Sequence, residues 1–409
     1  MDNMGQPDRL DRRIIIMVAA GCAISLVTFG ARSAFGVFTE PLSSFYDWPR
    51  GIFALALAWQ NLIWGISQPL CGALGERFGA WRVLVVGGIL YAAGLIMMPA
   101  VDAPIGLHMT AGLLVGLGMG GASYITVISV LGRDVPEAQR GWALGLCTAA
   151  GSLGQCLMVP MGQVFLDLYG WQIAVMLIGG LVALVPVMAL GLRVERNEDR
   201  VAKVSDESLA QVLRRACVHP SYLMVTGGFF VCGFQLSFIT VDLPSHLTDN
   251  GITATVAALA MSTIGIFNMV GAYGAGVLSS RYSRKYLLSL IYTGRAVAIA
   301  VFIVLPPTPI TTLVFAASMG LLWLSTVPLT SGLVALMFGS RHMATLFGLT
   351  FLSHQIGSFL GVWLGGVIFD ATQSYGLAWW LSVGLSLLAA MLNLPISERP
   401  AWLRPVPAE

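Results

Sequence analysis

Long apolar runs, separated by arginine, proline and glycine-rich turns, dominate this sequence. A membrane-spanning α-helix needs ~20 mainly apolar residues, and the runs predict twelve such spans, at about 14–40, 51–74, 83–100, 106–131, 141–164, 171–192, 221–243, 254–279, 286–305, 310–337, 344–369 and 376–395. Spanning strands are disfavoured because the runs are continuous rather than alternating. Only 10% of the residues are charged, against ~25% in soluble domains. The predicted fold class is an all-α polytopic membrane protein.

The two halves of the chain repeat each other. The segment GALGERFGAWR after the second span corresponds to GVLSSRYSRK after the eighth, with Gly72 matching Gly276. The fifth span aligns without gaps with the eleventh, which pairs Gly145 with Gly348. We therefore predict two pseudo-symmetric six-helix bundles, 1–192 and 220–409, joined by a cytoplasmic linker at 193–219. A site between the bundles is expected near the bilayer midplane.

The distribution of basic residues predicts the orientation of the chain. Lys and Arg collect in short loops on the cytoplasmic side of a membrane. With the N-terminus inside, 19 of the 22 Lys and Arg residues fall in cytoplasmic segments, Arg50 falls on the opposite side, and Arg32 and Arg295 fall within spans. Both termini are therefore predicted to be cytoplasmic, in a plasma membrane. The preference for arginine over lysine favours a bacterial inner membrane.

Several classes of function are excluded or disfavoured by composition and motifs. A formal net charge of +2 gives no reason to expect a nucleic-acid partner. No cluster of His, Cys, Asp or Glu has the spacing of a metal or catalytic site, and no nucleotide-binding loop is present. Neither an enzyme nor a bound cofactor is therefore expected. A monomer is predicted because no additional oligomerisation element is visible.

The loop after the second span resembles a signature of the major facilitator superfamily. Its pattern G-x-x-x-(D/E)-R-x-G is matched by Gly72, Glu76, Arg77 and Gly79. After Gly79 the sequence departs from the pattern, since alanine and tryptophan replace the usual basic pair. The resemblance implies that this loop helps to hold a cytoplasmic gate. Simple anchoring of the loop by its charge is the alternative.

A narrower resemblance is to the monocarboxylate transporters and their bacterial relatives. The segments GLGMGGASYITV and RGWALGLCTAAGSLGQ are similar to stretches in that family's fourth and fifth spans, and Arg32-Ser33 is similar to a Lys-Ser pair in its first span. The segment FNMVGAYGAG resembles one with an Asp and, four residues on, the Arg expected to hold the carboxylate. Here those positions are Asn268 and Ala272. The resemblance implies that Tyr124 and Asn268 lie near a substrate site.

Two arginines lie at depths where a charge is costly. An arginine at the bilayer centre costs ~3 kcal/mol on insertion scales. Arg295 falls near the midplane and Arg32 in the outer half of the first span, while no predicted span carries Asp or Glu at its centre. An anionic substrate is the simplest complement, since guanidinium binds carboxylate through two hydrogen bonds. Alternatively, Arg32 snorkels outward or pairs with Glu40, and Arg295 bonds backbone carbonyls in a helix-packing role.

Two residues are candidates to carry a coupling proton. His354 lies near the middle of the eleventh span, and histidine titrates near neutral pH. Its alternative role is a neutral ring that donates to a neighbouring helix. Asp242 lies toward the outer end of the seventh span. Pro244 suggests a helix break there, which would leave the Asp242 carboxylate facing outside water.

These observations predict a secondary active transporter that moves a small organic anion, a monocarboxylate, with a proton by alternating access. The alternatives are a proton-driven exporter of drugs or metabolites and an anion exchanger on the same fold. A membrane sensor is disfavoured because the tails and central loop are short. The expected partners are the anion, protons and the lipid bilayer. The predicted site residues are Arg32, Tyr124, Asn268, Arg295 and His354 for substrate, Asp242 and His354 for protons, and Gly72, Glu76, Arg77 and Gly79 for gating.

Overall fold

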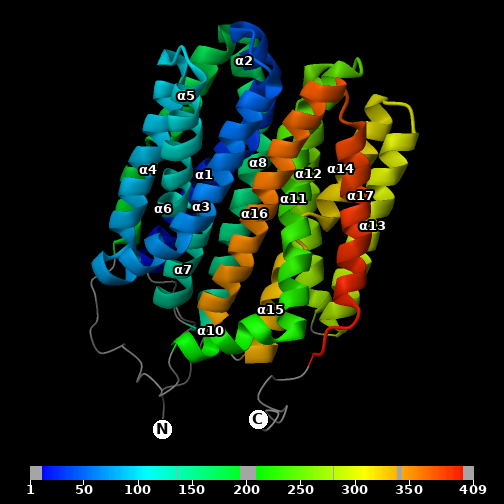
Figure 1. The fold of residues 1–409 in the computed structure, drawn as a ribbon. Helices are drawn as coiled ribbons and strands as arrows, with labels where there is room; N and C mark the ends of the chain where they lie inside the picture. Colours follow the sequence, from blue (N-terminus) through cyan, green and yellow to red (C-terminus); the bar gives the residue numbers. More distant parts are fainter. Residues whose placement is uncertain (1–11, 136, 194–208, 280, 339–342, 399–409) are drawn as a thin grey trace, which may run out of the picture.

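The computed structural model describes residues 12–135, 137–193, 209–279, 281–338 and 343–398 (Figure 1). These residues form helices joined by short turns, and no strand occurs among them, which confirms the all-α fold class. The first half contains α1 (Arg12–Ser33), the 3-10 helix η1 (Ala34–Phe38), α2 (Thr39–Tyr46), α3 (Arg50–Phe78), α4 (Ala80–Met97), η2 (Met98–Ala100), α5 (Pro104–Leu107), the π-helix η3 (His108–Leu114), α6 (Val115–Ala122), α7 (Tyr124–Asp134), α8 (Glu137–Val182), α9 (Val185–Ala189) and η4 (Leu190–Leu192).

The second half of the chain is helical in the same way. It contains α10 (Leu209–Val218), α11 (Pro220–Asp249), α12 (Ala254–Leu278), α13 (Arg284–Val304), α14 (Pro309–Leu322), α15 (Thr326–Phe338), α16 (Met343–Thr372) and α17 (Gly376–Asn393). In Figure 1 the helices of the first half gather on the left and those of the second half on the right, with α16 along the boundary. The division into bundles at 192 and 220 stays a prediction.

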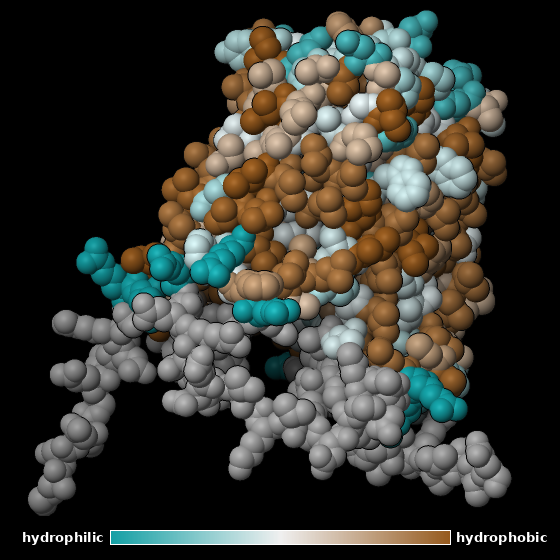
Figure 2. Space-filling model, turned by 60° about the vertical axis from the view of Figure 1, so that its left-hand side comes forward, coloured by the Kyte–Doolittle hydropathy of each residue, from teal (hydrophilic) through white to brown (hydrophobic). Residues whose placement is uncertain are grey.

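The helices are long and apolar enough for a polytopic membrane protein. Ten helical segments among the described residues meet this requirement. The twelve predicted spans are consistent with this number, because α3 adds a 29-residue helix and Gly170 divides α8 in two. Gly170 has φ 76° and ψ 168°, a conformation that glycine adopts without steric cost. Figure 2 shows apolar side chains over the flank of the molecule, where lipid would contact it.

Two helical passages are broken near the middle of the molecule. Between α6 and α7, Ser123 is extended (φ −74°, ψ 155°), and its hydroxyl caps α7 by accepting from the Thr126 amide. Between α14 and α15, the chain leaves the helix at Trp323–Ser325. Breaks of this kind expose backbone groups, which neighbouring side chains must satisfy inside a membrane.

The two ends of the molecule differ, and we name them by the helices that lie there. The α2 end carries α2 and α5, and the α10 end carries α10, which lies across the bundle (Figure 1). At the α2 end α3 and α16 touch, since a side chain on Gly366 would meet Gly51. Toward the α10 end, a methyl group added to Gly72 of α3 or to Gly348 of α16 would meet no atom within 4 Å. The backbone at Gly72 and Gly348 is therefore not packed against a neighbouring helix among the described residues.

Candidate functional site

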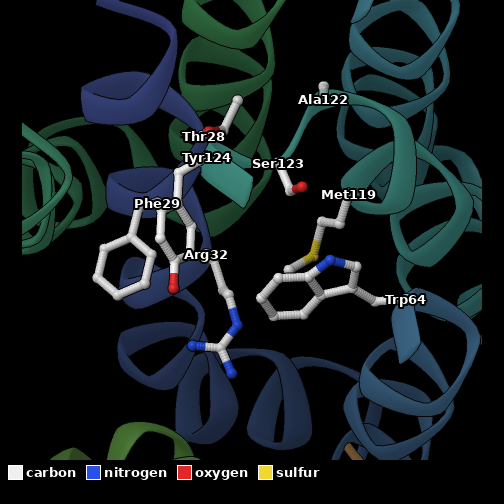
Figure 3. Close-up of a pocket in the computed structure, with 8 residues that line it drawn as sticks. All are labelled: Thr28, Phe29, Arg32, Trp64, Met119, Ala122, Ser123 and Tyr124. Carbon is white, nitrogen blue, oxygen red and sulfur yellow. The ribbon is translucent and has the colours of Figure 1, made fainter. Parts of the chain in front are cut away.

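A pocket surrounds Arg32 where α1, α3, α6 and α7 meet (Figure 3). Its enclosed space is about 10 Å³, and the empty space around it, open solvent included, is about 230 Å³. We call it the Arg32 pocket, and its lining consists of Thr28, Phe29, Arg32, Trp64, Met119, Ala122, Ser123 and Tyr124. The break before α7 thus opens onto the same space as the Arg32 side chain. The break places the C-terminal end of α6 and the N-terminal end of α7 beside this space, and their partial charges are opposite in sign.

Among the described residues, only neutral groups contact the guanidinium of Arg32. Its Nη2 donates to Asn61 Oδ1 at 3.1 Å and to Ser237 Oγ at 3.4 Å, the latter on α11 of the second half. The group also lies over the Trp64 ring, 5.3 Å from its centroid. Among the described residues, no carboxylate pairs with Arg32, and its buried Nε has no hydrogen-bond partner. The alternative pairing with Glu40 is therefore not formed.

The polar groups behind the pocket wall are hydrogen-bonded to one another. Gln68 Oε1 accepts from the Trp64 indole at 3.0 Å and from the Ser123 hydroxyl at 2.9 Å. Gln68 Nε2 donates to Thr126 Oγ1 at 3.3 Å. Within the part of the chain that the structure describes, the Tyr124 hydroxyl has no hydrogen-bond partner, and its ring contacts Phe29 edge-on. The pocket therefore presents the Arg32 guanidinium and the Tyr124 phenol, with the rings of Phe29 and Trp64 beside them.

A hydrogen-bond chain connects Arg32 with His354 across the two halves. Gln355 Nε2 donates to the Asn61 carbonyl at 3.1 Å, and Gln355 Oε1 lies 2.9 Å from His354 Nδ1. Because a carbonyl only accepts, the Gln355 amide must present its oxygen to His354, so Nδ1 carries the proton. His354 Nε2 is then the basic nitrogen of the ring. The chain runs from Arg32 through Asn61 and Gln355 to His354.

The His354 ring is packed among aromatic side chains. It is 8% exposed, stacks on Phe351 with the planes 9° apart, and lies 4.8 Å from the Phe229 ring. The Cys232 thiol also lies beside it.

Arg295 is engaged at the break between α14 and α15. It is fully buried, and its Nη2 donates to the carbonyls of Leu322 at 2.6 Å and Trp323 at 2.5 Å. Its Nε donates to Leu322 at 3.1 Å, and Nη1 lies 3.4 Å from Gln235 Oε1. A cation at the C-terminal end of a helix is favourable. The geometry thus favours the helix-packing role of Arg295 over direct anion binding.

Asn268 lies at the same break and not in the Arg32 pocket. Its Oδ1 accepts from the Leu324 amide at 3.0 Å, and its Nδ2 donates to Ser152 Oγ at 3.0 Å on α8. Asn268 therefore satisfies the interrupted backbone and joins the two halves. Of the predicted substrate residues, the structure brings Arg32 and Tyr124 together and connects His354 to them.

A cluster at the α2 end ties the halves together. Arg50 at the start of α3 forms a two-bond ion pair with Asp249 at the end of α11, at 2.5 and 2.8 Å. The same guanidinium donates to the Tyr375 hydroxyl at 3.3 Å and lies 4.2 Å from the Phe369 ring centroid. Beside it, the Gly51 amide donates to Asp370 at 2.8 Å. We call this set the Arg50 cluster.

Asp242 lies beneath the Arg50 cluster. It is 1% exposed, its carboxyl group faces Arg50 and Tyr375, and its Oδ2 has no hydrogen-bond partner among the described residues. Burial and the neighbouring Asp242 raise the pKa of the Tyr375 hydroxyl, so Tyr375 stays neutral. The interpretation that Asp242 faces outside water is wrong. So is the expected break at Pro244, because α11 continues through it to Asp249.

The residues of the predicted gating loop lie at the α10 end. Gly79 joins α3 to α4 with φ 93°, which explains the glycine, and Arg77 is exposed over the Phe78 ring. The side chain of Glu76 lies outside the described residues. The gating role of Gly72, Glu76, Arg77 and Gly79 stays a prediction.

Some site residues are not identifiable from the sequence. Asn61 and Gln355 are polar residues within spans, a type that more often connects helices than binds substrate. Trp64 carries no motif. The sequence does distinguish Arg50, because it is the only basic residue expected on the outer side.

Comparison with known proteins provides the family context for this geometry. The family model described as Major Facilitator Superfamily matches residues 21–361 and 225–407. A relative from Bacillus subtilis, "Uncharacterized MFS-type transporter YcxA", is 24% identical over 91% of this chain and 92% of its own. "Monocarboxylate transporter 12-B" from Danio rerio is 24% identical over 92% of this chain and 86% of its own.

Solved structures share the fold at low sequence identity. A D-xylose-proton symporter superposes with a TM-score of 0.75 and 14% identity, over 94% of this chain and 98% of its own. A bacterial homologue of the lysosomal transporter Spinster superposes with a TM-score of 0.76 and 15% identity, over 97% of this chain and all of its own. These superpositions show the overall fold.

Proposed function

Because the chain belongs to the major facilitator superfamily, we propose that it moves a small organic anion, a monocarboxylate, together with a proton by alternating access. Membership of this family makes it a transporter rather than an enzyme, as the sequence predicts. Relatives named as monocarboxylate transporters support the substrate class. A solved proton symporter of the same fold is compatible with proton coupling.

The observation that carries the proposal is the unpaired charge of Arg32. The guanidinium lines an open pocket, its Nε has no hydrogen-bond partner in the described chain, and only neutral groups hold its Nη2. A buried charge without a counter-ion is costly, and a carboxylate would supply the opposite charge.

The proposed coupling proton is carried by His354. Protonation of His354 Nε2 adds a positive charge to the chain that runs through Gln355 and Asn61 to Arg32. A carboxylate bound at Arg32 lowers the cost of that charge, and the protonated ring in turn favours the carboxylate. Binding of the two is therefore mutually favourable, which is what symport requires.

Movement between two states follows from the difference between the two ends. We take the α10 end as cytoplasmic, as the distribution of basic residues predicts. The Arg50 cluster then closes the outer side, and the free space beside Gly72 and Gly348 is compatible with an open inner side. Opening outward requires the ion pair of Arg50 with Asp249 to break.

Binding of L-lactate to the purified protein in nanodiscs, measured by calorimetry, tests this proposal. We expect tighter binding at acidic than at neutral pH, loss of binding in Arg32→Gln, and no change in the control Arg82→Gln, whose side chain is exposed. Loss of the pH dependence alone is expected in His354→Gln. Binding that survives Arg32→Gln unchanged would contradict the proposal.

A further inference from the structure

We propose that a second cavity, at the α2 end, binds a small organic cation that carries an ammonium group on an apolar body. The cavity lies where the ends of α11, α13, α16 and α17 meet, and we call it the Asp249 cavity. Its enclosed space is about 250 Å³. This is slightly below the ~300–1,000 Å³ of typical small-molecule sites, so the cavity has room for a small ligand. The inference does not depend on the proposed function.

The cavity is formed by the second half of the chain alone, because every residue that lines it follows His246 or is His246 itself. Its floor is made of packed rings: Phe302 and Trp379 lie 5.4 Å apart, and His246 lies 5.4 Å from Trp379. Phe302 and Trp379 are only 6% and 1% exposed. The rigid ring of Pro307 lies in its wall. The site is therefore preformed, which lowers the cost of binding.

The lining has an apolar part and a polar part. The end of α13 and the turn after it supply the apolar part, Phe302, Ile303, Leu305 and Pro307. The end of α11 and the turn between α16 and α17 supply the polar part, Asp249, Asn250, Gln373 and Ser374. A ligand that matches this lining has an apolar body and one polar group.

The charges at the cavity favour a cation as that polar group. Asp249 lines the cavity, whereas no lysine or arginine does so among the described residues. Behind Asp249, Arg50 is shared by the carboxylates of Asp249 and the neighbouring Asp370, so acids outnumber bases even with Asp242 neutral. A carboxylate has acceptor sites for about four hydrogen bonds, and Arg50 supplies two to Asp249. Asp249 can therefore accept from a second donor.

Binding at this cavity is linked to the Arg50 cluster. A cation beside Asp249 competes with Arg50 for the carboxylate and repels its guanidinium. Release of Arg50 in turn makes Asp249 a better partner for the ligand. The two effects are equal in size, because coupling between binding events is reciprocal. The cation therefore favours opening at the α2 end.

Calorimetry with benzyltrimethylammonium tests the inference on the full chain in nanodiscs, with empty nanodiscs subtracted. This probe has a permanent charge on an aromatic body. We expect it to bind the wild type, and benzyl alcohol, which lacks the charge, not to bind. Asp249→Asn should weaken binding roughly five-fold or more, whereas Arg50→Gln should strengthen it. Both substitutions break the same ion pair, so a merely structural effect would change both affinities in the same direction.

A second pair of variants tests whether the ligand occupies the cavity. Ile303→Trp places a large ring in the lining and should abolish binding. Val301→Trp is the matched control, because Val301 lies on the same helix, is 49% exposed and does not line the cavity. Circular dichroism and size-exclusion profiles establish that each variant is folded.

The outcomes separate this inference from the proposed function. No binding to folded wild type, undiminished binding in Asp249→Asn or Ile303→Trp, or weaker binding in Arg50→Gln would overturn it. Arg32→Gln should leave benzyltrimethylammonium binding unchanged while it abolishes lactate binding. Loss of benzyltrimethylammonium binding in Arg32→Gln would instead place the cation at another site and overturn the inference.

Discussion

Gln355 on α16 donates its side-chain amide to the main-chain carbonyl of Asn61 on α3, at 3.1 Å. This bond joins the halves of the molecule next to the place where Arg32 binds the Asn61 side chain. The other end of the same amide fixes the orientation of His354. The proposed anion site and the proposed proton site therefore share a single neutral connector.

Removing this connector should uncouple the proton from the anion. In Gln355→Leu we expect carboxylate binding at Arg32 to persist, because Arg32 itself is unchanged. The difference in affinity between acidic and neutral pH should fall to near zero, because no hydrogen-bond chain would then connect His354 with Asn61. Calorimetry at both pH values measures this, with Gln373→Leu, an exposed position, as control. A pH dependence equal to that of the wild type would contradict the claim that Gln355 couples the two sites.

Substitution of Arg295 should affect stability more than binding. Arg295→Met would leave the carbonyls of Leu322 and Trp323 without donors in a buried place. Each unsatisfied group costs about 1–3 kcal/mol, so a clear decrease in melting temperature is expected. Arg295→Lys should retain part of the stability that Arg295→Met loses. Thermal unfolding monitored by tryptophan fluorescence measures the effect, and lactate affinity in the surviving folded fraction should stay within about two-fold.

The Arg50 cluster should control opening at the α2 end. Arg50→Gln removes the ion pair with Asp249 and the contact with the Phe369 ring. A change of about 1–2 kcal/mol would shift the ratio of closed to open states by about 5–30-fold. Spin labels at Ser44 and Gln373, whose side chains are exposed on the two halves, report this ratio by double electron–electron resonance. Arg82→Gln should leave the distance distribution unchanged, and an unchanged distribution in Arg50→Gln would argue against the cluster as a gate.

Closure at the α2 end should depend on pH through Asp242. The closed state buries this carboxyl group with Oδ2 unpartnered among the described residues, and burying a charge costs free energy. Closure therefore favours the neutral acid, so the closed fraction should rise as pH falls. The groups that face Asp242 are Arg50 and Tyr375, with His246, Asp249 and Asp370 in or beside the cluster. Asp242→Asn should abolish the dependence, and the same spin-label pair measures it.

Much of the architecture could be predicted from the sequence. Apolar runs long enough to span a bilayer leave few alternatives to helices, and the matched glycines indicate the internal repeat. Arg32 was identifiable as a candidate anion contact because a charge within a span requires a partner. Trp64 and Asn61, which contact Arg32, could not be identified in this way, because their role depends on how α3 is rotated against α1.

The assignments that changed depended on details of helix packing. Arg295 and Arg32 look alike in sequence, yet only the break after Leu322 supplies carbonyls for Arg295. The environment of Asp242 cannot be inferred by treating Pro244 as a helix end, because a neighbouring helix can satisfy the backbone around a proline within a membrane. The role of Arg50 could have been inferred from its position as the one basic residue expected outside.

Gradient-driven uptake tests the central claim most directly. Radiolabelled lactate would be offered to liposomes containing the wild type, Arg32→Gln or Arg82→Gln, with and without an inwardly directed proton gradient. The account predicts gradient-stimulated uptake by the wild type and by Arg82→Gln, and none above empty liposomes by Arg32→Gln. Equal stimulation in Arg32→Gln, or no stimulation by the gradient in correctly inserted wild-type protein, would contradict it.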